Sequence, residues 1–359
     1  MKRLCAVLAA LLLCVPLRAM AVDVSAESAV LVDLTCGRVL YAKNADARRP
    51  IASTTKIMTA LVALQTAKLE DIVVVDASST RIEGSSLYLK PGDELTVREL
   101  LVGLMLRSGN DAAHALALHC AGSVEAFAGM MNAKAKQLGM INSHFANPHG
   151  LDDEYHYSTA RDMALLTSEA MRNPEFAALV RQRSARVAGQ VIHNHNRLLS
   201  LYDGAVGVKT GFTKTAGRCL VSAAERGGQT LVAVTLKASD DWDDHRGMLD
   251  YGFARYPLRT LMTGGTIVAE IPVAGGDAEL VPVRLGDSLR MALREEETPQ
   301  LTAAVELPPM VWAPVREGTF AGVVRFYLNG HEVAKGDLFW DADISQPEPE
   351  SLWKRLFGR

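Results

Sequence analysis

Residues 53–64 read STTKIMTALVAL, and this stretch places a serine and a lysine at the start of an amphipathic segment. Its apolar residues recur at the spacing of one helix face: Ile57, Met58, Leu61, Val62 and Leu64. The stretch therefore predicts a helix that opens at Ser53. Because residues three apart share a helix face, the Lys56 amine can reach the Ser53 hydroxyl. Serine becomes an effective nucleophile when a neighbouring base takes its proton, and lysine can be that base if burial or a nearby positive charge lowers its pKa.

The Ser-x-x-Lys spacing alone is a weak signal, since a second copy spans Ser351 to Lys354. Two further motifs strengthen it. Ser108-Gly109-Asn110 is the sole Ser-x-Asn of the chain; its hydroxyl can relay a proton and its amide can hold a substrate carbonyl, although Asn110 also fits a loop or capping position.

Lys209-Thr210-Gly211 is the sole Lys-Thr-Gly and ends a β-like run. Lysine and threonine there offer a charge and a hydroxyl to a substrate carboxylate, and Gly211 lets a substrate backbone lie close to the strand. Should Lys209 lie near Lys56, it would lower the pKa of Lys56 by like-charge repulsion. The three motifs in this order predict a serine acyl-transfer site.

The surrounding pattern predicts an α+β fold. Residues 29–33 and 39–42 form a β-hairpin around a turn at residues 35–37, a largely helical stretch follows from residue 53 to about 180, and β-like runs return at 205–209, 219–224 and 230–236. Strands at both ends with helices between them predict one sheet assembled from the two ends of the domain, not repeated βαβ units.

The character of the chain changes after Phe253. Residues 263–344 carry short β-like runs separated by Gly and Pro, at 268–273, 280–283, 311–315 and 322–327. This pattern predicts a small all-β second domain, followed by a linker and tail over residues 345–359.

The N-terminus is typical of an export signal. Lys2 and Arg3 precede an apolar run over residues 4–17, and Ala19-Met20-Ala21 provides small residues for cleavage after Ala21. The run is shorter than the ~18–20 residues of a spanning helix. The 38 Lys+Arg and 41 Asp+Glu lack the basic excess of a nucleic-acid-binding protein. Cys36, Cys120 and Cys219 would remain after cleavage; no Cys-x-x-Cys motif occurs, and free thiols are expected.

The chain resembles the serine D-alanyl-D-alanine carboxypeptidases, the low-molecular-mass penicillin-binding proteins. The resemblance covers nearly the whole mature chain and includes longer strings than the three motifs: residues 84–87, 90–93, 107–112, 147–151, 157–162, 194–199, 207–213 and 249–253. It implies a penicillin-binding-protein/β-lactamase-like catalytic domain over residues 22–262 and a β-rich domain over 263–344. It also implies a peptidoglycan stem peptide ending in D-Ala-D-Ala as substrate, β-lactams as covalent inhibitors and no cofactor.

The resemblance also assigns roles by position. Ser53 would be the nucleophile with Lys56 as its base, and Ser108 would assist proton transfer to the leaving D-alanine together with Lys209. The implied substrate-binding residues are Asn110, Lys209, Thr210, Gly211 and Phe212, with the backbone N–H groups of Ser53 and Phe212 forming the oxyanion hole. Some relatives carry an arginine upstream of the Tyr-Gly-Phe segment that helps to bind the terminal carboxylate. The spacing differs here, which leaves open whether Arg246 takes that role.

Three alternatives share these motifs: a β-lactamase, a D-alanyl-D-alanine endopeptidase and a penicillin-binding wall protein without turnover. By resemblance, a class A β-lactamase needs a Glu-x-x-Leu-Asn loop, whereas the segment that starts at Glu169 has arginine in place of leucine. No metal site is expected, because His193 and His195 lack a third ligand at a suitable spacing. We interpret both, and His149 of the Asn-Pro-His-Gly turn, as structural histidines.

The last nine residues, 351–359, combine an apolar face (Leu352, Trp353, Leu356 and Phe357) with Lys354, Arg355 and Arg359. Such a segment suits a membrane surface, and a frayed tail is the alternative. Family members often end in an amphipathic helix. By this resemblance we expect an exported protein on the outer face of the cytoplasmic membrane.

Overall fold

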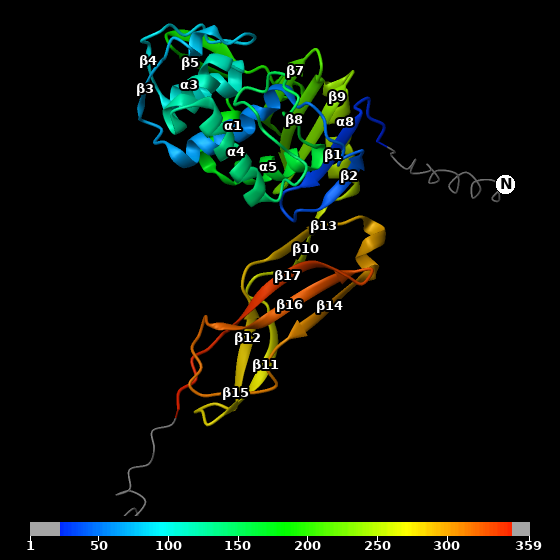
Figure 1. Ribbon diagram of the computed structural model, residues 1–359. Helices are drawn as coiled ribbons and strands as arrows, with labels where there is room; N and C mark the ends of the chain where they lie inside the picture. Colours follow the sequence, from blue (N-terminus) through cyan, green and yellow to red (C-terminus); the bar gives the residue numbers. More distant parts are fainter. Residues whose placement is uncertain (1–21, 347–359) are drawn as a thin grey trace, which may run out of the picture.

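Five antiparallel strands form the central sheet, and they come from two distant parts of the chain (Figure 1). The structure, a computed structural model, describes residues 22–346. The strand order is β2 (Val39–Lys43), β1 (Ser28–Asp33), β9 (Gln229–Ala238), β8 (Gly217–Arg226) and β7 (Ala205–Thr213). The predicted sheet built from both ends of the domain is therefore confirmed.

Both faces of this sheet are covered, so its central strands are apolar on each side. Val30 and Val234 belong to the larger core, which includes the apolar face of α1 (Lys56–Thr66). Leu31 and Leu231 point the other way and pack with Leu249 of α8 (Asp241–Arg255). Alternate residues of one strand thus serve opposite layers, as the period of two in a β-strand requires.

The helical region between residues 53 and 180 also contains strands that the helical expectation did not include. The remaining helices are α2 (Val97–Val102), α3 (Asn110–Ala121), α4 (Val124–Leu138), α5 (Ala160–Arg172), α6 (Pro174–Val180) and α7 (Leu198–Leu201). Within this region β3 (Ile72–Val74) and β4 (Glu94–Thr96) form a two-stranded sheet. A hairpin of β5 (Ser184–Val187) and β6 (Gln190–His193) follows after residue 180. Local caps set several boundaries; α2, for example, begins with a capping box between Thr96 and Glu99.

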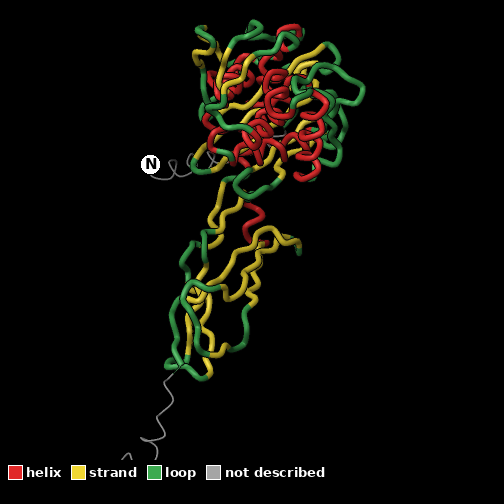
Figure 2. Tube along the Cα trace, turned by 60° about the vertical axis from the view of Figure 1, so that its left-hand side comes forward, coloured by secondary structure: helices red, strands yellow, loops and turns green. Residues whose placement is uncertain are grey.

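The second region is all β, as expected, and it extends away from the first (Figure 2). Its six-stranded sheet has the order β14 (Leu301–Glu306), β16 (Phe320–Leu328), β17 (His331–Trp340), β12 (Leu280–Leu285), β11 (Ile267–Ala274) and β15 (Val311–Trp312). Beside it, β10 (Leu258–Met262) pairs with β13 (Leu289–Ala292), so a boundary drawn at residue 262 divides one strand pair. The run predicted at 311–315 forms a strand over two residues only.

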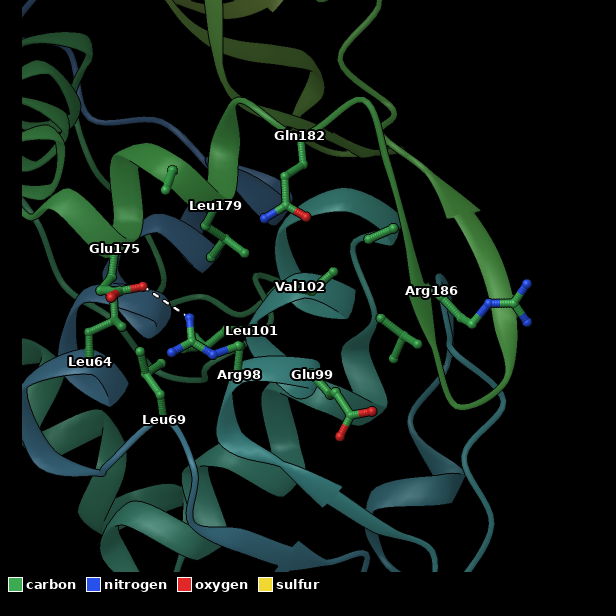
Figure 3. A pocket seen from close by; sticks show the side chains of 13 residues that line it. Leu64, Leu69, Arg98, Glu99, Leu101, Val102, Glu175, Leu179, Gln182 and Arg186 are labelled. Carbon is green, nitrogen blue, oxygen red and sulfur yellow. Dashed lines mark hydrogen bonds and ion pairs between the residues drawn. The ribbon is translucent and has the colours of Figure 1, made fainter.

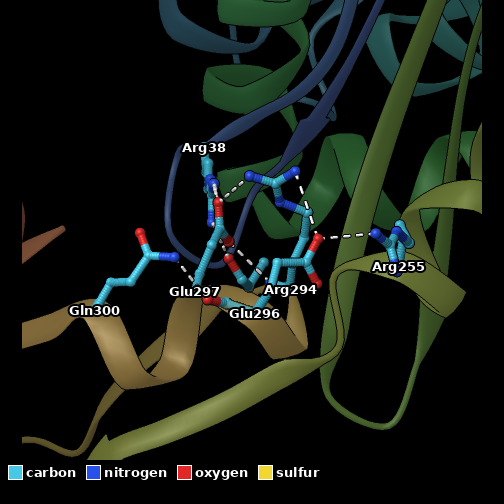
Figure 4. A network of polar contacts seen from close by, with 7 residues as sticks. Arg38, Arg255, Arg294, Glu296, Glu297 and Gln300 are labelled. Carbon is cyan, nitrogen blue, oxygen red and sulfur yellow. Dashed lines mark hydrogen bonds and ion pairs between the residues drawn. The ribbon is translucent and has the colours of Figure 1, made fainter. Parts of the chain in front are cut away.

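A polar network joins the two regions (Figure 4). Arg38, in the turn between β1 and β2, donates bidentately to Glu297 at 2.6 and 2.9 Å, and Arg294 donates to the same carboxylate at 2.9 Å. Burial would raise the pKa of Glu297, but these hydrogen bonds outweigh burial and lower the pKa to about 2. A second ion pair connects Arg255 at the end of α8 to Glu296 at 2.8 Å. These contacts attach the β region to the end of the central sheet.

The expected signal peptide (1–21) and amphipathic tail (351–359) lie outside the described residues. Of the helices between residues 22 and 346, none has both the length and the apolar character that a membrane-spanning segment requires. In the same part of the chain, Cys36, Cys120 and Cys219 are free thiols, and no group of His, Cys, Asp and Glu has the arrangement of a metal site.

Candidate active site

Ser53 lies at the start of the first helix, where a 3-10 turn (Ala52–Thr55) leads into α1. The preceding Ala52 has a φ of +47°, a left-handed conformation that costs a non-glycine residue about 1–2 kcal/mol. Ser53 is half-buried, whereas Lys56 is fully buried one helical turn further on. The chain thus turns sharply just before Ser53 and presents the hydroxyl at the edge of the protein interior.

The Lys56 amine has three oxygen partners. Nζ lies 2.9 Å from Ser53 Oγ, 2.6 Å from Asn110 Oδ1 and 2.7 Å from the backbone carbonyl of His149. The amide and carbonyl oxygens can only accept hydrogen bonds, so they take two N–H groups of the amine. A neutral amine has two N–H groups and one lone pair, and the lone pair then faces Ser53 Oγ. This is the geometry of a base that removes the serine proton.

Asn110 is the first residue of α3, and a hydrogen bond to Glu83 fixes the orientation of its side-chain amide. Its Nδ2 donates to the Glu83 carbonyl at 2.6 Å, which leaves Oδ1 to face Lys56. The amide was expected to hold a substrate carbonyl, but here both ends of it are engaged within the protein. Asn110 is 3% exposed, and in this arrangement it positions Lys56.

The Asn147-Pro148-His149-Gly150 turn supplies the third contact of Lys56. The Pro148 carbonyl accepts a 2.5 Å hydrogen bond from Thr59 of α1, which fixes the turn against that helix. Gly150 has a φ of +84°, and a Cβ there would lie 2.0 Å from the Ala52 carbonyl oxygen. Glycine is therefore required for the turn to approach the chain beside Ser53. His149 contacts Lys56 through its backbone carbonyl and not through its ring.

Burial and a nearby positive charge favour the neutral form of the Lys56 amine. Burial, and secondly the positive charge of Lys209, lower the pKa of Lys56 well below its usual value. Burial alone lowers the pKa of Lys209 to about 7. The like-charge effect anticipated from the sequence is thus present. Burial is the larger contribution to the lowered pKa of Lys56, since water no longer stabilises its ammonium form.

Strand β7 brings the Lys-Thr-Gly motif against Ser53. The Lys209 amine donates to the Thr210 carbonyl at 2.8 Å. A Cβ on Gly211 would lie 3.0 Å from the backbone nitrogens of both Ser53 and Thr54, so glycine allows β7 to pack against the start of the helix. The sequence suggested close approach of a substrate backbone at this glycine; the structure shows close approach of the protein's own backbone. Phe212 is 66% exposed at the rim.

Ser108 follows a π-helical turn (Gly103–Arg107) and has a left-handed conformation, with φ +65°. It faces the same cleft as Ser53. Within residues 22–346, no hydrogen bond joins Ser108 Oγ to Lys56 or to Lys209. Ser108 therefore shares the cleft with Ser53 without being part of the Lys56 cluster.

These residues line a cleft of about 310 Å³. Its walls are Ser53, Ser85, Ser108, His195, Thr210, Gly211, Phe212, Arg218, Asp241 and Trp242. Lys56, Lys209 and Asn110 lie behind this surface. The sequence motifs assign no role at the site to Arg218, Asp241 or Trp242. The register of the strands could have placed Arg218 there, because Arg218 of β8 pairs directly opposite Phe212. Burial, with Lys209 and Arg107 nearby, lowers the pKa of His195 to about 4, so this histidine is neutral at pH 7.

Arg246, the residue left open as a carboxylate ligand, does not line this cleft. It forms an ion pair with Asp243 on α8. A more apolar groove of about 260 Å³ lies elsewhere, between α2, α6 and β5 (Figure 3). Leu69, Leu101 and Leu179 line it beside the 3.0 Å Arg98–Glu175 ion pair, and its lining contains no serine, cysteine or histidine. The chemistry-bearing residues therefore converge on the Ser53 cleft.

Comparisons with known proteins identify the family of this chain. The family model described as D-alanyl-D-alanine carboxypeptidase matches residues 16–240, and the model of the penicillin-binding protein 5 C-terminal domain matches residues 256–346. D-alanyl-D-alanine carboxypeptidase DacF of Bacillus subtilis is 32% identical, over 93% of this chain and 89% of that protein. D-alanyl-D-alanine carboxypeptidase DacC of Escherichia coli is 36% identical, over 88% of this chain and 83% of that protein.

Solved structures align with either most of the chain or about two thirds of it. The crystal structure of penicillin binding protein 5 from Haemophilus influenzae aligns with a TM-score of 0.76 and 29% identity, covering 90% of this chain and 98% of that one. The D-alanyl-D-alanine carboxypeptidase from Mycobacterium tuberculosis aligns with a TM-score of 0.64 and 38% identity, covering 66% of this chain and 93% of that one. With a Ser53–Lys56 pair backed by Asn110 and β7, and with these matches along nearly its whole length, the chain belongs to the D-alanyl-D-alanine carboxypeptidase family of low-molecular-mass penicillin-binding proteins.

Proposed function

We propose that this protein is a serine-type D-Ala-D-Ala carboxypeptidase that removes the terminal D-alanine from peptidoglycan stem pentapeptides through a Ser53 acyl-enzyme. The observation that carries the proposal is the Lys56 amine, which lies 2.9 Å from Ser53 Oγ and has two acceptor-only oxygens on its other sides. A buried lysine of lowered pKa in this position is a general base for the serine.

In the acylation step, Ser53 Oγ attacks the carbonyl carbon between the two D-alanines while Lys56 takes the hydroxyl proton. The backbone N–H groups of Ser53 and Phe212 stabilise the oxyanion, where one donor is typically worth about 3–4 kcal/mol. The C–N bond then breaks, and the D-alanine amine leaves with a proton delivered through Ser108, assisted by Lys209. Thr210, which lines the cleft, holds the substrate carboxylate end through its hydroxyl. Water hydrolyses the ester, which releases the shortened peptide and restores Ser53.

β-Lactams enter by the same first step. Ser53 opens the lactam ring to form an ester, and the amine that would leave stays tethered to the acyl group. A class A β-lactamase uses a loop glutamate for deacylation, and no glutamate lines the cleft among residues 22–346. Glu169 instead lies on α5, where it forms ion pairs with Lys134 and Arg172, and it does not line the cleft.

The test is mass spectrometry of purified muropeptides before and after incubation with the enzyme. We expect pentapeptides to lose one alanine while cross-linked dimers stay intact. Cleavage of dimers without alanine release would identify an endopeptidase, rapid release of hydrolysed penicillin would identify a β-lactamase, and covalent labelling without any turnover would identify an inert binder. Ser53→Ala should abolish labelling by a fluorescent penicillin; persistent labelling of a folded variant would overturn the assignment of the nucleophile.

The same proposal extends to location. Residues 1–21 act as a cleaved export signal, residues 22–262 and 263–344 act as the catalytic and β-rich domains, and residues 351–359 attach the protein to the outer face of the cytoplasmic membrane. Support comes from the charge and apolar pattern of both end segments and from the cell-wall substrate of the family. Deletion of residues 351–359 should move the protein from the membrane fraction to the soluble fraction; an unchanged distribution would contradict the anchoring role.

A further inference from the structure

We infer that Arg218, and not Arg246, is the guanidinium that binds the terminal carboxylate of the substrate. This inference rests on the proposed function, because it concerns the carboxylate of a peptide or penicillin acylating Ser53. It assigns a specificity role to a residue of β8 that lies outside all three motifs.

The position of Arg218 follows from strand register. In the β7–β8 pair, Arg218 is the direct partner of Phe212, and Gly211 is the partner of Cys219. Partners in an antiparallel pair lie side by side, so Arg218 extends from the strand next to the Lys-Thr-Gly motif. It lines the Ser53 cleft together with Thr210. A substrate lying along β7 beyond the scissile bond therefore reaches Arg218.

The Arg218 guanidinium is oriented by contacts that leave its outer edge available. Nε donates to Asp241 Oδ1 at 2.8 Å, and the carboxylate of Asp241 is 5% exposed at the start of α8. The Arg218 guanidinium lies over the Trp242 ring, with Cζ 6.0 Å from the ring centroid. Within residues 22–346, no hydrogen bond engages Nη1 or Nη2 of Arg218. These two nitrogens form the planar fork that binds a carboxylate bidentately.

The other candidate cations are less suited to this role. Among the described cleft-lining residues, Arg218 is the sole arginine or lysine. Lys56 and Lys209 are 0% and 1% exposed, and their amines already donate to oxygens of the protein. Arg246 is paired with Asp243 away from the cleft. The cation that can meet an incoming carboxylate without rearrangement of the buried cluster is thus Arg218.

The experiment removes the carboxylate from the ligand as well as the arginine from the protein. The second-order rate of Ser53 acylation is measured with a penicillin and with its neutral methyl ester, using wild-type protein, Arg218→Gln and Arg218→Lys, with Arg246→Gln as the matched control. Arg218→Gln should slow acylation by the free acid roughly 10- to 100-fold and leave acylation by the ester unchanged. Arg218→Lys should show a smaller loss for the acid, and Arg246→Gln should match wild type with both ligands.

An equal loss for acid and ester, or no loss for the acid, would overturn the inference. If Arg218→Gln fails to fold because Asp241 loses its partner, Arg218→Lys retains a positive charge there and provides the same acid-against-ester comparison. The measurement needs only acylation by a penicillin. Absence of D-alanine release by wild-type protein would therefore refute the proposed function without deciding the role of Arg218.

Discussion

Replacement of Asn110 by aspartate tests whether Lys56 acts as the neutral base. The substitution keeps the size of the side chain and places a carboxylate at the atom that lies 2.6 Å from Lys56 Nζ. At that separation and an effective dielectric of about 20, a unit negative charge stabilises the ammonium form by about 6 kcal/mol. This energy corresponds to about 4–5 pKa units, which opposes the lowering caused by burial and Lys209.

Lys56 of the Asn110→Asp variant should therefore remain protonated at neutral pH, and the serine should lose its base. Acylation of Ser53 by a fluorescent penicillin at pH 7 should fall at least about 100-fold, the lower range of what a general base contributes. The remaining rate should rise with pH, because the fraction of neutral amine increases tenfold per pH unit below its pKa. Stopped-flow or quenched gel measurements of labelling from pH 6 to pH 10 provide the profile.

Asn132→Asp is the matched control. Asn132 exchanges two hydrogen bonds with the backbone of Phe145, at 2.8 and 2.9 Å, so the same amide-to-carboxylate change occurs at another partly buried asparagine. It should keep the wild-type pH profile even where its melting temperature falls. A folded Asn110→Asp variant with the wild-type rate and pH profile would refute the neutral-lysine argument.

Three further changes have definite outcomes. Gly211→Ala places a Cβ 3.0 Å from the Ser53 backbone nitrogen and should slow acylation of Ser53 roughly tenfold or more. Gly247→Ala on α8, where a Cβ has no atom within 4 Å, should be acylated at the wild-type rate. Equal rates for the two variants in a penicillin-labelling assay would contradict the close-packing argument. Burial lowers the pKa of His245 to about 3 from 6.5, so its neutral form stabilises the fold fully above pH 6.5 and this stability is lost as the pH falls towards 3. The loss from this group is about 2 kcal/mol between pH 7 and pH 5, and calorimetry of His245→Gln should show a smaller decrease in melting temperature over that range. Glu297→Gln removes the carboxylate that joins Arg38 to Arg294 and should reduce the free energy of unfolding by roughly 2 kcal/mol in urea titration; an unchanged midpoint would show that the network between the two regions adds no stability.

Local sequence was sufficient for much of the fold. Hydrophobic periodicity predicted the helix after Ser53, the strands of both ends of the central sheet and the β character of the second region, since each of these patterns depends on neighbours in the chain. The two-stranded sheet of β3 and β4 was missed, because three-residue strands carry too few alternations to stand out. The pairing of β10 with β13 was also missed, because the strands are separated by two others and pair only in three dimensions.

The candidate site also depends partly on local sequence and partly on tertiary packing. The sequence by itself predicted which residues carry the chemistry and determined that Ser53 and Lys56 meet, since they are one helical turn apart and helix geometry alone brings them together. Only the tertiary structure decided that Lys56 is buried, that Asn110 and the His149 carbonyl direct its lone pair to Ser53, and that Arg218, not Arg246, faces the cleft. The physical reason is that burial, pKa and contacts between distant segments depend on how helices and strands pack, and short motifs contain no information about that packing.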